Sequence, residues 1–160
     1  MQVHCVRAFG PVCESLGRLV SDVPVVLHSW AGAAEVVAQL LRLRAPVYFS
    51  LSGHLAKVPP RKAIPMVRSI PLDRLLLESD SPDGALRLSA VWLEALPQLA
   101  GLPPRLERFE AGNTPAAVRC VLELVAAVLG RPAEEVAAAT RANYLAVFGT
   151  IPVPPRRPPD

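Results

Sequence analysis

Long apolar runs, aromatic residues and cysteines are all scarce in this sequence, in which aromatic residues make up 5%. No apolar run approaches the roughly 18 residues that a membrane span requires, so the sequence predicts no membrane segment. Residues 1–7 lack the charged and then apolar layout of a secretory signal, and we expect an intracellular protein, cytoplasmic by default. The three cysteines, Cys5, Cys13 and Cys120, are too few and too scattered for a disulfide framework or a zinc ribbon.

Composition and length predict one globular domain. The chain has 160 residues, of which 51% are hydrophobic and 19% charged, which is enough to bury a substantial core. The net charge of +3 is weak evidence for a nucleic-acid partner, because much of the excess lies in a Pro/Arg-rich tail. We expect the domain to occupy residues 1–149, and residues 150–160 to form a disordered or extended tail.

Short β-rich runs alternate with longer helical stretches, which is typical of parallel βαβ units. Beyond Asp80 the pattern becomes irregular, and the Pro/Leu-rich segment from Ala85 to Gly112 has no clean period. Two further helices close the chain. The predicted strands are Gln2–Cys5, Val23–His28, Pro46–Ser52 and Arg74–Asp80, and the predicted helices are Phe9–Leu19, Ala33–Arg44, Arg61–Ser69, Pro115–Leu129 and Pro132–Phe148.

Each predicted strand reaches a polar residue at or near its C-terminal end: His4, His28, Ser52 and Asp80. In parallel α/β folds the C-terminal strand ends share one rim, where chemistry takes place. Imidazole and carboxylate groups gathered there would bind divalent metal ions. Taken singly, each His or Asp is more often a hydrogen-bonded, surface or turn residue. For His54 we expect a surface or phosphate-contacting role rather than that of a ligand.

Four sequence motifs, in order, resemble the TatD family of metal-dependent hydrolases. They are VHCVRAF, which carries His4; VVLHSWAG, which carries His28; VYFSLSG, which carries Ser52; and LLLESDSP, which carries Asp80. The triplet Asn113-Thr114-Pro115 stands where the family usually reads Asn-Glu-Pro. The resemblance extends from about Val3 to Gly149.

The resemblance implies the C-terminal half of a TIM (β/α)8 barrel, with about four parallel strands and flanking helices. It also implies a two-metal site for phosphodiester hydrolysis, usually of DNA. Mixed His and carboxylate ligands suit Mg, Mn or Zn, and the choice among these divalent ions stays open. His4 and His28 would be ligands of one ion, and Asp80 would bind the other and act as the catalytic residue by holding or deprotonating the attacking water. Glu78 would support these groups without being a ligand itself.

The family's N-terminal ligands, a His-x-His pair and a bridging Glu, do not occur in this sequence. We therefore expect a half-barrel with low or no activity on its own and self-association through its open sheet edges. Two interpretations stay open: a fragment of a complete enzyme, or a short product that dimerises, pairs with another chain or does without catalysis. Two other functions also stay open, an inactive scaffold and an amidohydrolase-like enzyme for a substrate other than nucleic acid.

Overall fold

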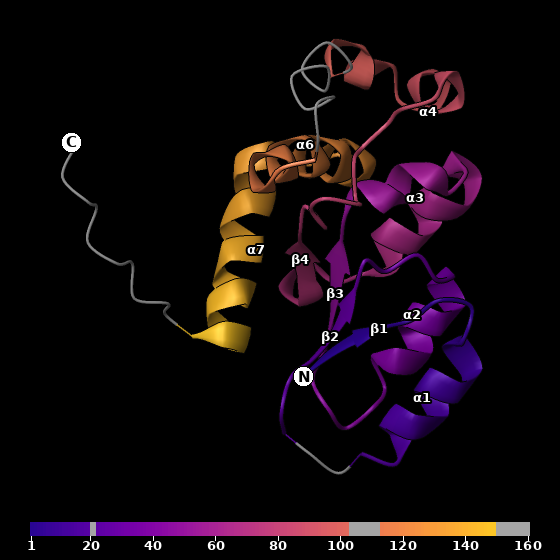
Figure 1. Cartoon of the computed structure of the whole chain (residues 1–160), viewed down its shortest axis with the longest axis vertical. Coiled ribbons are helices and arrows are strands. Elements are labelled where there is room, and N and C mark those ends of the chain that lie inside the picture. The colour runs from indigo at the N-terminus through magenta and orange to yellow at the C-terminus, as the bar shows by residue number, and fades with distance from the viewer. Residues whose placement is uncertain (20–21, 103–112, 150–160) are drawn as a thin grey trace, which may run out of the picture.

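The computed structural model describes residues 1–19, 22–102 and 113–149, and its centre is a sheet of four parallel strands in chain order. The strands are β1 (Gln2–His4), β2 (Val25–His28), β3 (Val47–Leu51) and β4 (Leu75–Leu77). All four predicted strands are present, although β4 is shorter than the run that predicted it. Parallel neighbours need crossover connections, and helices occupy each crossover (Figure 1).

The register separates a helix-facing side of the sheet from the side that carries the polar rim. Leu27 pairs with Val3 and Phe49, and it belongs to the main hydrophobic core. Val26 is also buried, with 2% of its surface exposed, but it lies on the opposite face from Leu27. Because residues two apart share a face, His28 continues the side of Val26. The sheet thus turns His28 away from the main core.

Three helices, α1 (Phe9–Gly17), α2 (Ala34–Leu40) and α3 (Pro60–Ser69), lie together on one side of the strands in Figure 1. Trp30 fixes the packing where α1 meets the sheet. Its ring lies 5.3 Å from that of Phe9 and 5.5 Å from that of Phe49, in edge-on contacts. Trp30, two residues after the end of β2, is therefore held in the core.

The last two helices are α6 (Val118–Leu129) and α7 (Ala133–Phe148), and the short turn η5 (Pro115–Ala117) leads into α6. Gly130 ends α6 in the left-handed conformation, with φ of 65°, as the sequence predicts. Asn143 anchors α7 beside β4: its Nδ2 donates to the carbonyl oxygens of Leu72 and Leu75, each at 2.8 Å. In Figure 1, α7 lies beside β4, at the end of the sheet farther from α1 and α2.

The prediction of irregular structure from Ala85 to Gly112 is wrong in part, because α4 (Ala90–Ala95) and η3 (Pro97–Gly101) lie within it. Elements this short carry too little periodicity to be read from sequence, and tertiary packing stabilises them. Trp92 supplies that packing: it is 1% exposed, and its Nε1 donates to the carbonyl of Ala56. The rest of that segment, residues 103–112, and the predicted tail lie outside the described residues. Among the described helices, none has the length and apolar character needed to cross a membrane.

Candidate metal centre

The C-terminal ends of β1 and β2 bring two imidazoles together. His4 and His28 pair directly in the strand register, and their ring centroids are 5.2 Å apart. His4 is exposed at the outer edge of the sheet, whereas the side chain of His28 is 22% exposed. The predicted convergence of these two residues is therefore present in the structure.

Glu78, which directly follows β4, holds His28 in place. The His28 Nδ1 lies 2.9 Å from the Glu78 carboxylate, whose side chain is 18% exposed. The same carboxylate accepts hydrogen bonds from the Ser50 hydroxyl at 2.7 Å, the Ser29 amide at 2.7 Å and the Ser29 hydroxyl at 2.8 Å. These bonds tie the ends of β2, β3 and β4 to one side chain. They also direct the other ring nitrogen of His28, Nε2, away from Glu78.

Asp80 lies between two histidines. One carboxylate oxygen is 3.2 Å from His28 Nε2, and the other is 3.0 Å from His54 Nε2. Asp80 has a positive φ of 49°, an uncommon conformation for a residue with a Cβ. This conformation turns the chain after β4, so both Glu78 and Asp80 approach the hydroxyl of Ser29, at 2.8 and 3.0 Å.

Close backbone packing supports the turn that carries Asp80. A Cβ at Gly53 would lie 2.1 Å from the carbonyl oxygen of Gly84, and a Cβ at Gly84 would lie 2.5 Å from the Cβ of Asp80. Asn113 fastens the same turn from the other side. Its side-chain Nδ2 donates to the backbone carbonyl of Ser79 at 2.6 Å, and its backbone carbonyl accepts from the Ser81 hydroxyl at 2.7 Å.

The donor groups suit a divalent cation in their chemistry and in one of their spacings. Two imidazoles on one tetrahedral zinc ion have ring centroids about 5 Å apart, close to the 5.2 Å between His4 and His28. The 3.2 Å between His28 Nε2 and an Asp80 carboxylate oxygen is the distance of a direct ion pair. Across the described ranges, however, no group of three or more His, Cys, Asp or Glu residues is arranged to hold a metal. The chain supplies pairs of donors rather than a complete ligand set.

Two residues at this rim have closer contacts with the donor groups than the sequence indicated. His54, for which we expected a surface or phosphate-contacting role, contacts Asp80, and its side chain is 27% exposed. The sequence feature that pointed to a role at the rim was the position of His54 just after the end of β3. Ser29 contacts Glu78, Asp80 and Ser52 through one hydroxyl. Its positive φ of 47° makes this possible, and nothing in the sequence indicated that conformation.

Comparison with known proteins agrees with this architecture. Residues 1–149 match the family described as TatD related DNase. The metal-dependent hydrolase YcfH of Escherichia coli (strain K12) is 33% identical over 129 residues, which are 81% of this chain and 41% of YcfH. An amidohydrolase from Saccharomyces cerevisiae has a TM-score of 0.74 at 18% identity, covering 92% of this chain and 53% of that one. A TatD family hydrolase from Entamoeba histolytica has a TM-score of 0.74 at 16% identity, covering 94% of this chain and 51% of that one.

The chain therefore spans about half the length of these relatives, and the predicted half of a TIM barrel is confirmed.

Proposed function

Because this chain belongs to the TatD related DNase family, we propose that it supplies half the active site of a divalent-metal-dependent hydrolase that cleaves phosphodiester bonds in DNA. One observation supports this most strongly. Glu78 binds the Nδ1 side of His28, while Nε2 of the same ring faces Asp80. A histidine whose second nitrogen is held by a carboxylate is the usual form of a metal-ligating histidine.

The residues of this half have distinct roles in the proposed reaction. His4 and His28 would hold one cation, and Asp80 would hold another. A bound divalent cation neutralises phosphate charge and lowers the pKa of water. Glu78 keeps the His28 ring oriented, and Asp80 accepts a hydrogen bond from the attacking water at a carboxylate oxygen and receives its proton. Close packing of Gly53 against Gly84 keeps the turn that carries this carboxylate in place.

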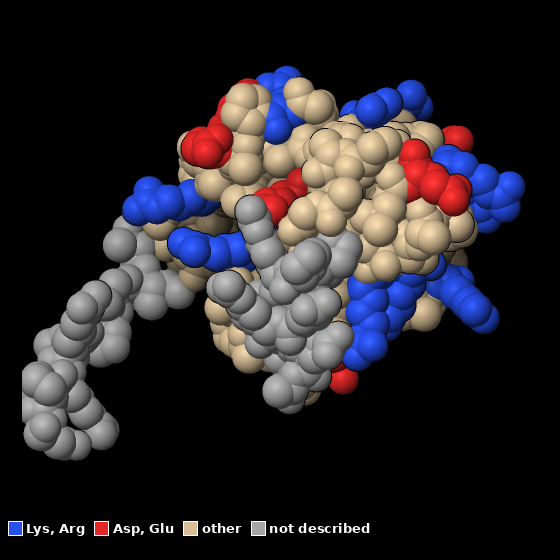
Figure 2. Space-filling model, turned by 90° about the horizontal axis from the view of Figure 1, so that it is seen from above, with Lys and Arg blue, Asp and Glu red and all other residues tan. Residues whose placement is uncertain are grey.

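Basic residues close to the rim support a polyanionic substrate. Lys57 lies in η1 (Gly53–Lys57), which directly follows β3, and Arg61 and Lys62 lie in the first turn of α3; all three are exposed. Figure 2 views the molecule from above, the side toward which β3 points in Figure 1, and shows Lys and Arg mostly around the outline. Phosphate contacts from such residues give salt-dependent affinity without reading base sequence.

Metal binding tests the ligand assignment without relying on activity. Titration of the purified chain with Zn²⁺ or Mn²⁺ in a calorimeter should show binding that weakens at least roughly tenfold in His28→Ala. Asp73→Asn, a carboxylate change at the opposite end of β4, is the control and should bind as the unaltered chain does. Equal affinity in all three proteins would remove His28 from the ligand set and favour an inactive scaffold.

Activity tests the reaction class. We expect slow, metal-dependent cleavage of bis(p-nitrophenyl) phosphate and of a labelled DNA strand, because donors outside this half are needed for full activity. Asp80→Asn should abolish the cleavage, and Asp73→Asn should not affect it. An ester of p-nitrophenol and an amide of p-nitroaniline complete the panel of substrates. Metal-dependent hydrolysis of the amide with no cleavage of either phosphodiester would instead indicate amidohydrolase chemistry.

A further inference from the structure

A pocket separate from the metal centre lies between the starts of helices α1, α2 and α3, and we call it the outer pocket. Its volume is about 480 Å³, within the roughly 300 to 1,000 Å³ of small-molecule sites. Phe9 lines it from the segment after β1, residues 31–35 from the segment after β2, and residues 58–65 from the segment after β3. Because all three segments follow the C-terminal ends of their strands, the outer pocket lies at the same end of the sheet as the metal centre.

The charged residues of the outer pocket are two cations and one carboxylate. Arg61 and Lys62 belong to the first turn of α3, and Glu35 belongs to the first turn of α2. All three are exposed, and none of them makes an ion pair or a side-chain hydrogen bond with another described residue. The pocket therefore has a net positive charge, and its two cationic side chains are available to an anionic ligand.

A buried hydrogen-bond donor lies behind one wall of the outer pocket. Trp30 is 2% exposed, and its Nε1 has no hydrogen-bond partner among the described residues. A Cβ added at Gly32, which lines the pocket, would lie 2.2 Å from Cζ2 and 2.8 Å from Cε2 of Trp30, so the edge of the indole next to Nε1 faces Gly32. Buried polar groups are nearly always hydrogen-bonded, and an unpaired one indicates that an acceptor binds there. The indole N–H is a third donor, on the Gly32 side of the pocket.

We propose that the outer pocket binds one nucleotide of the DNA strand, away from the phosphodiester bond that is cleaved at the metal centre. Arg61 and Lys62 bind the phosphate of this nucleotide, because a guanidinium and an ammonium give charge-assisted hydrogen bonds to phosphate oxygens. Phe9 supplies an aromatic surface for the base. The inference rests on the proposed DNA substrate, but it uses none of the metal ligands.

The rest of the lining favours a nucleotide over a small inorganic anion. Phe9, Val58 and Pro65 add apolar surface beside the cations, and an anion with no apolar part would leave that surface in contact with water. The two cations lie on α3, whereas Glu35 lies on α2. The phosphate is therefore bound at α3, and Glu35, which repels phosphate, accepts a hydrogen bond from an N–H or O–H of the nucleoside.

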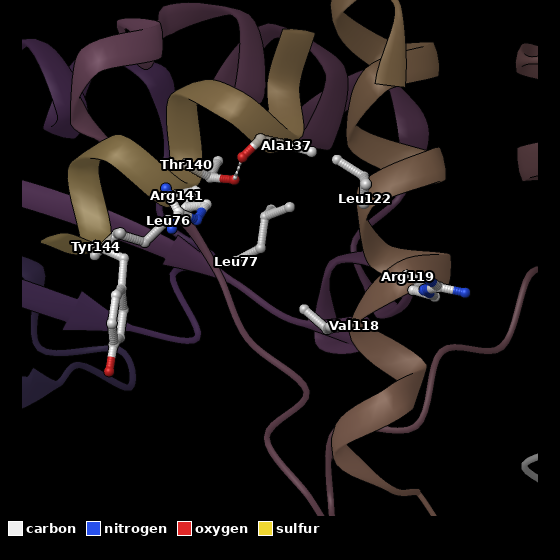
Figure 3. A pocket seen from close by; sticks show the side chains of 9 residues that line it. All are labelled: Leu76, Leu77, Val118, Arg119, Leu122, Ala137, Thr140, Arg141 and Tyr144. Atoms are coloured by element: carbon white, nitrogen blue, oxygen red, sulfur yellow. Dashed lines mark hydrogen bonds between the residues drawn. The ribbon is translucent and has the colours of Figure 1, made fainter. Parts of the chain in front are cut away.

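Binding of a fluorescein-labelled thymidine hexanucleotide to the full chain in EDTA tests the outer pocket without the metal centre. Changing Arg61→Gln together with Lys62→Gln should raise the dissociation constant at least roughly tenfold. The slope of log K against log salt should fall by about 1.4, which is about 0.7 for each lost phosphate contact. Arg119→Gln together with Arg141→Gln is the matched control, because it removes the same charge from two exposed arginines that line another groove, between β4, α6 and α7 (Figure 3). This control should bind the strand as the unaltered chain does, and circular dichroism checks that both double variants are folded.

Competition identifies the ligand. Thymidine monophosphate should displace the labelled strand at a concentration at least roughly tenfold lower than inorganic phosphate does, because only the nucleotide has a base to contact Phe9. No strand binding, equal weakening in the two double variants, or displacement by inorganic phosphate as readily as by thymidine monophosphate would each overturn the proposal.

The outer pocket and the proposed function can fail separately. Metal-dependent DNA cleavage with the same KM in the Arg61→Gln, Lys62→Gln variant as in the unaltered chain would overturn the pocket and leave the proposed function standing. Strand binding that depends on these two cations, in a chain that cleaves no DNA with any divalent metal, would support the pocket and count against the proposed function.

Discussion

Replacing Glu78 with alanine should destabilise the fold, because this carboxylate joins three strand ends. It accepts hydrogen bonds from the Ser29 amide, the Ser29 hydroxyl and the Ser50 hydroxyl, and contacts His28 Nδ1, at distances of 2.7 to 2.9 Å. At about 1 kcal/mol for each hydrogen bond, the loss is about 3 to 4 kcal/mol. Since 18% of the side chain is exposed, water replaces only part of what is lost. For a chain of this size, Tm should fall by about 10 °C.

Urea unfolding followed by circular dichroism, at one fixed protein concentration, measures this effect. Glu94→Ala changes an exposed carboxylate on α4 and is the control; it should lower the free energy of unfolding by less than about 0.5 kcal/mol. Glu78→Gln keeps the shape but turns an amide N–H₂ toward two donors, so an intermediate loss of about 1 to 2 kcal/mol is expected. If Glu78→Ala were as stable as Glu94→Ala, these bonds would not hold the rim together.

Other contacts lead to three more predictions. Asn143→Ala removes both bonds to the carbonyls of Leu72 and Leu75 and should lower the free energy of unfolding by about 2 kcal/mol, with faster amide exchange in α7; unchanged exchange would contradict this anchor. Gly53→Ala should displace the turn that carries Asp80 and weaken metal binding, whereas Gly101→Ala, where an added Cβ meets nothing within 4 Å, should not; equal effects in the two variants would count against the packing argument. Burial raises the pKa of the Cys13 thiol, and Cys5 nearby raises it further, so Cys13 in the folded chain should react with iodoacetamide more slowly at pH 8 than in the urea-unfolded chain. Because folding disfavours only the thiolate, Cys13 lowers stability only as the pH rises above the ordinary thiol pKa. A Cys13→Ser variant that lost the same stability over that pH range would refute this sign.

Much of the fold could be read from local patterns. The apolar run that ends at His28 is buried on both faces, and the helix expected to end before Gly130 does so, because strand burial and helix termination depend on nearby residues. The short helix α4 was missed. It depends on Trp92 bonding to the carbonyl of Ala56, a contact across 36 residues that no local period encodes.

The candidate site, like the fold, could be predicted from the sequence only in part. The placing of His4 beside His28 follows from parallel strands with polar residues at their ends, so residue order alone predicted it. The contacts of His54 and Ser29 with Asp80 could not be predicted. They depend on positive φ angles at Ser29 and Asp80 and on the close approach of Gly53 and Gly84.

Residue order was enough to predict that four apolar strands run parallel and present imidazoles and carboxylates at one edge, because burial and strand alternation are properties of neighbouring residues. The way those groups meet depends on the folded chain as a whole. Glu78 is the shared acceptor, and Asp80 lies between two histidines, because backbone turns and side-chain hydrogen bonds between distant segments fix where these side chains lie.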